Sequence, residues 1–115
     1  MSDPDAIVFI YSTAPSQAEA ERLARAVIEA GQAACVNMLP GMTSMYMWQG
    51  ELQAESEIAM LFKTTRACST EAIDLIVRMH PYDTPAVTAF AASDVDPRFA
   101  AWVRTETGTE TRDKN

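Results

Sequence analysis

Hydrophobic and polar positions repeat with two different periods along the chain, and this predicts the order of its elements. The β-branched and aromatic run at 6–11 is typical of a strand. A helical spacing follows, with apolar residues at Ala20, Leu23, Ala24 and Val27. That spacing predicts an amphipathic helix. Ser16, three positions before Glu19, is typical of an N-terminal capping box, and Gly31 is a favourable residue just beyond a helix end.

The middle of the chain has the pattern of a hairpin. Extended runs at 33–39 and 43–48 are separated by Pro-Gly at 40–41. Gln-Gly at 49–50 is a tight-turn signal, and the run at 56–63 predicts the returning strand. We therefore expect two antiparallel strands here, the first of them interrupted.

A second helix and strand follow the hairpin. Ser69 can cap this helix, and Pro81 ends it because proline donates no backbone hydrogen bond. The apolar face comprises Ile73, Ile76, Val77 and His80. The segment 86–91 predicts the last main strand, and Pro97 opens a short helix at 98–104.

The predicted order is β-α-β-β-α-β with a short C-terminal helix, which is the ferredoxin-like order of an α+β sandwich. We expect a single domain over 1–115. Within it, 1–5 is a tail, 6–104 is the ferredoxin-like domain, and 105–115 is a polar, frayed tail.

Both faces of the predicted strands are apolar. In the first strand Ile7 and Phe9 alternate with Val8 and Ile10, and the third strand is similar. A ferredoxin-like sheet carries both helices on one face, so a monomer would expose the other. An uncovered apolar face of this size marks an interaction site, and we expect a homo-oligomer.

Charge and composition exclude several classes of protein. The chain has 16 acidic and 9 basic residues, so its net charge is −7, which disfavours nucleic acid as a partner. No apolar run reaches the roughly 20 residues that span a membrane. The acidic start at 1–5 lacks the basic region of a signal peptide. Cys35 and Cys68 fit free thiols, and we expect a cytoplasmic protein.

Few residues could carry chemistry. The chain has one histidine and 4 glycines, and no nucleophile or phosphate-loop motif, so we expect neither an enzyme nor an organic cofactor. His80 could ligate a metal ion with Asp83 or a distant cysteine, or it could cap its helix and bond a carbonyl. Met45 and Met47 could bind Cu(I) through sulfur or simply fill a strand face. For His80 the spacing favours the helix cap over a metal ligand, and for Met45 and Met47 it favours packing over copper binding.

Several ordered motifs resemble the CutA family of divalent-cation tolerance proteins. The run at 33–46, Trp-Gln-Gly at 48–50, Lys-Thr-Thr at 63–65 and His-Pro-Tyr at 80–82 carry the resemblance. Further matches are Thr13-Ala14-Pro15, Pro85, Phe99 and Trp102. The resemblance covers about residues 7 to 104.

The resemblance implies a cytoplasmic bacterial homotrimer, similar in architecture to PII signalling proteins, that serves in tolerance of copper and other divalent cations such as zinc. It implies no enzymatic activity. The family's copper ligands match positions Ser12, Met79 and His80, of which only His80 keeps the family's ligand type. The resemblance also implies clefts between subunits, in which a regulatory ligand could bind.

Two functions follow from the sequence. One is a trimeric regulator that binds a cation or small ligand in a cleft lined by Trp48, Lys63 and Tyr82. The other is a structural trimer that anchors a protein partner without catalysis. Both include contacts between copies of this chain, and neither involves nucleic acid or a membrane.

Overall fold

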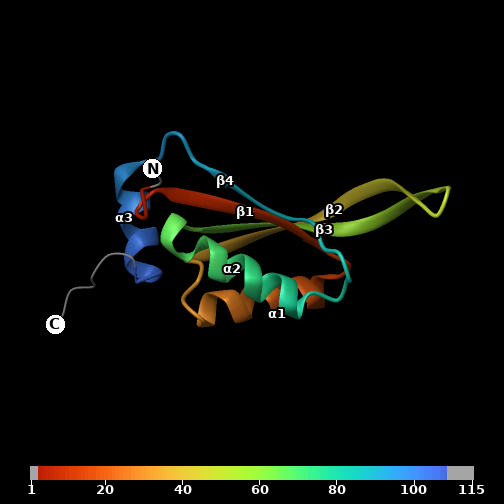
Figure 1. Ribbon diagram of the computed structural model, residues 1–115, viewed down its shortest axis with the longest axis horizontal. Helices are drawn as coiled ribbons and strands as arrows, with labels where there is room; N and C mark the ends of the chain where they lie inside the picture. Colours follow the sequence, from red (N-terminus) through yellow and green to blue (C-terminus); the bar gives the residue numbers. More distant parts are fainter. Residues whose placement is uncertain (1–2, 109–115) are drawn as a thin grey trace.

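The computed structural model describes residues 3–108 and has four strands and three helices in that range (Figure 1). Their bounds are β1 (Ile7–Ala14), α1 (Gln17–Glu29), β2 (Cys35–Trp48), β3 (Glu51–Thr65), α2 (Arg66–Met79), β4 (Val87–Ala91) and α3 (Pro97–Glu106). The predicted order of elements is therefore confirmed. The parts of the predicted tails at 1–2 and 109–115 lie outside the described residues.

The four strands form one antiparallel sheet in the order β2-β3-β1-β4. Figure 1 shows α1 and α2 together on one face of this sheet. Central β1 and β3 separate the outer strands, which is the arrangement of a ferredoxin-like α+β fold. We call the face without α1 and α2 the open face.

Helix α1 forms as its sequence predicts. Its four buried residues are Ala20, Leu23, Ala24 and Val27. The Ser16 hydroxyl accepts a 3.2 Å hydrogen bond from the Glu19 amide, which satisfies one free donor of the first turn. The Glu19 carboxylate does not complete the capping box, because it pairs with Arg22 at 2.8 Å instead. Gly31 has a φ of +75°, the left-handed conformation that glycine adopts freely.

The predicted cap of α2 at Ser69 is wrong. The helix begins at Arg66, directly after β3, and its N-cap residue Thr65 makes no capping bond through its side chain. Ser69 lies inside the first turns, where its hydroxyl donates to the Arg66 carbonyl at 3.1 Å. A strand that runs straight into a helix leaves no linker in which a polar cap residue would be recognised.

Strands β2 and β3 form a longer hairpin than the sequence predicts. Pro40 and Gly41 do not end β2, since they only shift its register between Leu39 and Met42. The turn residues Gln49 and Gly50 have φ values of +50° and +82°, as a tight hairpin turn requires. The paired segments 42–48 and 51–57 project beyond the helices in Figure 1, and we call them the arm.

The main core lies between the sheet and the two long helices. Its fully buried large side chains include Ile10 and Phe62 from the sheet and Leu23 and Ile76 from the helices. Side chains alternate along a strand, so Phe9 and Tyr11, on either side of Ile10, point to the open face. The apolar content of both strand faces is therefore divided between this core and the open face.

Helix α3 covers one end of the open face. Ala100 and Val103 pack with Ile7 in a second buried cluster, against which Phe9 and Phe99 also lie. This helix ends at Glu106, two residues beyond its predicted end, and Thr107 is buried behind it. Residues 105–107 therefore do not belong to a frayed tail.

Apolar side chains of the open face and of both faces of the arm stay exposed in the single chain. Leu39 and Phe90 keep 51% and 49% of their surface accessible, and four arm residues keep more than 60%. The latter are Met45, Met47, Trp48 and Leu52. Within residues 3–108 no helix is long and apolar enough to cross a membrane.

Candidate functional site

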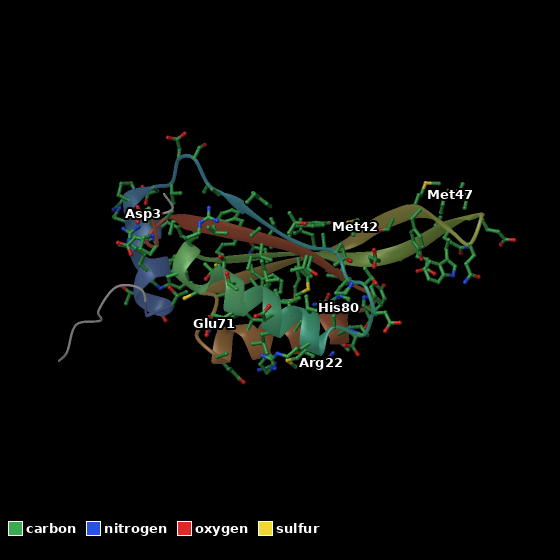
Figure 2. The ribbon with its side chains drawn as sticks, in the orientation of Figure 1. Asp3, Arg22, Met42, Met47, Glu71 and His80 are labelled. Atoms are coloured by element: carbon green, nitrogen blue, oxygen red, sulfur yellow. The ribbon has the colours of Figure 1, made fainter. Side chains whose placement is uncertain are left out.

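A cleft opens on the open face at the base of the arm. It encloses about 790 Å³ and is bounded by β1, the arm and the 82–86 loop. Its lining residues are Tyr11, Thr13, Ser44, Met45, Tyr46, Trp48, Gln53, Glu55, Glu57, Tyr82, Asp83, Thr84 and Ala86. Figure 2 labels Met42 at the base of the arm and Met47 near its tip. We call this cavity the open-face cleft.

Glu57 is the anchor of the cleft. The residue is 8% exposed, and its carboxylate accepts hydrogen bonds from hydroxyls of three different segments. Ser44 donates to Oε1 at 2.6 Å, while Tyr82 and Thr13 donate to Oε2 at 2.7 and 3.3 Å. Hydroxyl donors satisfy a buried carboxylate geometrically but supply no positive charge. The Glu57 charge therefore has no counter-ion among these partners.

The charged lining of the cleft is entirely acidic. Glu55 lies two residues before Glu57 on the same face of β3, and its Oε1 accepts a 3.0 Å bond from the Tyr46 hydroxyl. Asp83 adds a third carboxyl group from the loop. Among the described residues that line the cleft, none is Lys, Arg or His. The potential of the cleft therefore favours cations.

His80 positions the loop that carries Tyr82 and Asp83. It is the C-cap of α2 and is 8% exposed. Its Nδ1 accepts a 3.1 Å bond from the Tyr82 amide, so the ring proton lies on Nε2 and is donated to the Thr13 carbonyl at 2.6 Å. This ring thereby joins the end of α2 to β1, and the predicted bond to a carbonyl is observed.

Burial and the acidic groups together raise the pKa of two tyrosines in the cleft. Burial, followed by the hydrogen bond to Glu57, raises the pKa of Tyr82 well above its usual range. The hydrogen bond to Glu55 is the main cause that raises the pKa of Tyr46. Both effects favour the neutral phenol, which is the form that donates to a carboxylate.

We expect Tyr82→Phe to change the alkaline stability of the protein. A pKa that is higher in the folded than in the unfolded chain stabilises the fold below about 10, the ordinary tyrosine value, and this contribution disappears as the pH rises through the folded pKa. Removing the bond to Glu57 should cost on the order of 1 kcal/mol at pH 8. The difference between wild type and variant should shrink above pH 10 in urea unfolding curves.

Tyr46→Phe is the control for this measurement, because Tyr46 also bonds a carboxylate but is exposed. We expect a smaller loss for it at pH 8. A Tyr82→Phe loss that is constant from pH 8 to 11 would show that Glu57 does not hold the Tyr82 proton.

The three positions matched to copper ligands lie near the end of α2, but their donor atoms are engaged or enclosed. Both ring nitrogens of His80 are hydrogen-bonded within the subunit. Met79 packs against the main core. The Ser12 hydroxyl is fully buried and has no hydrogen-bond partner. No group of three or more His, Cys, Asp or Glu suited to a metal ion occurs among residues 3–108.

The predicted cleft residues separate into two places. Trp48 and Tyr82 line the open-face cleft. Lys63 does not, since it lies six positions beyond Glu57 on β3, or about 20 Å along an extended strand. There its ammonium donates to Asn37 and lies 5.2 Å from the ring centroid of Phe9.

Glu57 is not among the residues predicted from the sequence. Its only signal there is an acid within a strand pattern.

The chain matches a known protein family over most of its length. The family model described as CutA1 divalent ion tolerance protein matches residues 8–106. The divalent-cation tolerance protein CutA of Yersinia pestis (strain Pestoides F) is 36% identical over 108 residues, covering 90% of this chain and 91% of that protein. The sequence likeness therefore extends over the sheet, the helices and the arm.

Solved structures agree with the sequence matches. The divalent ion tolerance protein CutA1 from Ehrlichia chaffeensis has a TM-score of 0.87 and 32% identity, covering 89% of this chain and 95% of that chain. The periplasmic divalent cation tolerance protein CutA from Archaeoglobus fulgidus has a TM-score of 0.85 and 38% identity, covering 88% and 98%. That relative is described as periplasmic, so the cytoplasmic location of this chain stays a prediction.

Proposed function

This chain belongs to the CutA1 divalent ion tolerance family, and from that premise we propose that it is a homotrimeric regulator that binds a cation in the open-face cleft. The relatives' names describe tolerance proteins and not catalysts. One observation carries the proposal: every charged side chain that lines the cleft is acidic, and the most buried of them, Glu57, bonds only neutral hydroxyls.

The cleft favours cations for an electrostatic reason. Two unit charges of opposite sign 4 Å apart attract by about 1 kcal/mol in water and by about 4 kcal/mol at the lower effective dielectric near a protein surface. Glu57 is nine-tenths buried, so its charge is screened less than that of a surface acid. Glu55 and Asp83 add to the same potential from the strand and the loop. Copper and zinc are the divalent cations that we propose to enter there, as hydrated ions.

The hydrogen bonds of His80 support a cation in the cleft over a copper site at His80 itself. Copper bound at His80 would have to displace either the Thr13 carbonyl or the Tyr82 amide, because neither ring nitrogen is free. Breaking the second bond would also move Tyr82 away from Glu57. Ser12 supplies a hydroxyl, which is a poor ligand for soft copper. We therefore propose that His80 positions the cleft.

The open face supports assembly into a homotrimer. Leu39 and Phe90 expose about half of their surfaces, and the arm exposes four large apolar side chains. Apolar area of this kind is normally covered by another chain. A trimer that covers the open face would also narrow the entrance of the cleft, so that a bound cation could be sensed across a subunit boundary as in PII-like regulators.

Calorimetric titration with Cu(II) and Zn(II) tests the placement of the cation. We expect Glu57→Gln to weaken binding at least tenfold, equivalent to about 1.4 kcal/mol, because it removes the buried charge and keeps the shape. His80→Gln should weaken binding less. Glu71→Gln is the matched control, since Glu71 is an exposed acid on α2 away from the arm (Figure 2).

The opposite pattern would contradict the proposal. If Glu57→Gln binds both metals as wild type does and His80→Gln does not bind them, the cation lies at His80 and the cleft is not the site. Circular dichroism of each variant confirms that it is folded before the titration is interpreted.

A further inference from the structure

We propose that the open-face cleft takes a small organic cation, one that carries a primary ammonium or a guanidinium group. This inference rests on the proposed function, because it uses the same cleft. It goes further by naming the chemical class of the ligand. The cleft combines a buried acceptor, acidic surroundings and aromatic walls, and these three features together select an organic cation.

Glu57 has an acceptor position left for such a ligand. A carboxylate offers about four lone-pair positions. Oε2 already accepts from Tyr82 and Thr13, whereas Oε1 accepts only from Ser44. One lone-pair position on Oε1 therefore has no donor among the described residues. A charged N–H···O bond is roughly twice as strong as a neutral one and would supply the positive charge that the three hydroxyls do not.

The walls of the cleft are aromatic. Tyr46 and Trp48 lie on the same face of β2, Tyr11 faces them from β1, and Tyr82 comes from the loop. An ammonium or guanidinium group is attracted electrostatically to the face of such rings. Tryptophan is the strongest partner of this kind, and Trp48 is among the lining residues of the cleft. Together with the acids, the rings favour cations that also have a hydrocarbon portion.

A bare metal ion would use these features poorly. A dehydrated divalent cation needs several oxygen, nitrogen or sulfur ligands within about 2.0–2.6 Å, and residues 3–108 hold no group of three His, Cys, Asp or Glu suited to that. The hydroxyls on Glu57 also occupy lone pairs that direct metal ligation would use. The volume of about 790 Å³ lies within the range of small-molecule sites and far exceeds that of one ion.

Calorimetry of the intact protein in amine-free phosphate buffer tests this inference. The probe is agmatine, which carries both a guanidinium and an ammonium group, and 1,4-butanediol is its uncharged control. We expect agmatine but not the diol to bind wild type. Binding should weaken at least tenfold in Glu57→Gln and also in Trp48→Ala, and it should stay unchanged in Glu71→Gln. Trp48 is largely exposed in the single chain and lies outside the main core, so the fold of its variant keeps the test valid if Glu57→Gln does not fold.

Each other outcome separates this inference from the function it rests on. If wild type does not bind agmatine but binds Zn(II) in a Glu57-dependent way, the organic-cation inference is wrong and the proposed function stands. If neither probe binds, both are wrong. If agmatine binds Glu57→Gln and Trp48→Ala with the affinity that it has for wild type, it lies elsewhere on the acidic surface and the inference is overturned.

Discussion

Phe62→Ala is expected to lower the free energy of unfolding by about 3–5 kcal/mol. Phe62 is fully buried at the centre of the main core, on the face of β3 that packs against α1 and α2. The variant loses the favourable free energy of transferring the ring out of water. It also leaves a cavity between the sheet and helices α1 and α2. Urea unfolding monitored by circular dichroism measures the loss, at one fixed subunit concentration because assembly adds to stability.

Phe62→Met is the control for this change, since it keeps most of the side-chain volume. We expect a loss of about 1.5 kcal/mol or less for it. A loss below 1 kcal/mol for Phe62→Ala would mean that the side chain is not enclosed by the helices, and the face assignment of β3 would then be wrong.

Phe90→Asp is expected to convert the proposed trimer into monomers. Phe90 lies on edge strand β4, with its ring 6.2 Å from that of Phe9 and about half of its surface exposed in the single chain. A carboxylate without a partner in an apolar interface costs about 3–5 kcal/mol, and a homotrimer contains three of them. Light scattering at micromolar concentration should change from about three times the 12.6 kDa subunit mass to the subunit mass alone.

Ile28→Asp is the matched control for the charge. Ile28 is an exposed residue of α1, 41% accessible and on the other side of the sheet. This variant should remain trimeric. Wild-type protein that is already monomeric, or Phe90→Asp protein that stays trimeric, would show that the open face around Phe90 is not an interface.

Local signals in the sequence predict much of the fold. The four apolar positions of α1, its Ser16 cap and the glycine after it are confirmed, because each depends on residues within one or two turns. The hairpin turn at Gln49 and Gly50 is confirmed for the same reason, since its backbone conformation is a property of the two residues.

Two of the errors lie at the ends of β3. The predicted third strand begins at 56, which is too late, because the segment 51–55 pairs residue by residue with β2 in the arm and its Leu52 and Ala54 alternate with polar residues. Ser69 has the composition of a cap, but the register of β3 already places Thr65 at the helix start. The start of α2 is therefore not encoded in neighbouring residues alone.

The candidate site was predicted only in part. Trp48 and Tyr82 were expected in a cleft and do line one, because they flank the predicted turn and loop. Glu57 was missed because its role depends on partners 44, 13 and 25 residues away, at Thr13, Ser44 and Tyr82. An acid inside a strand pattern is a sign of a special environment, and the tertiary structure supplies the rest.

The cation site is tested most directly by the anomalous scattering of zinc in crystals of the assembled protein grown with Zn(II). Binding in the open-face cleft predicts a zinc peak beside Glu57, joined to its carboxylate through a water, with both His80 hydrogen bonds intact. A peak on a His80 ring nitrogen at about 2.0–2.1 Å, with no zinc in the cleft, would contradict it.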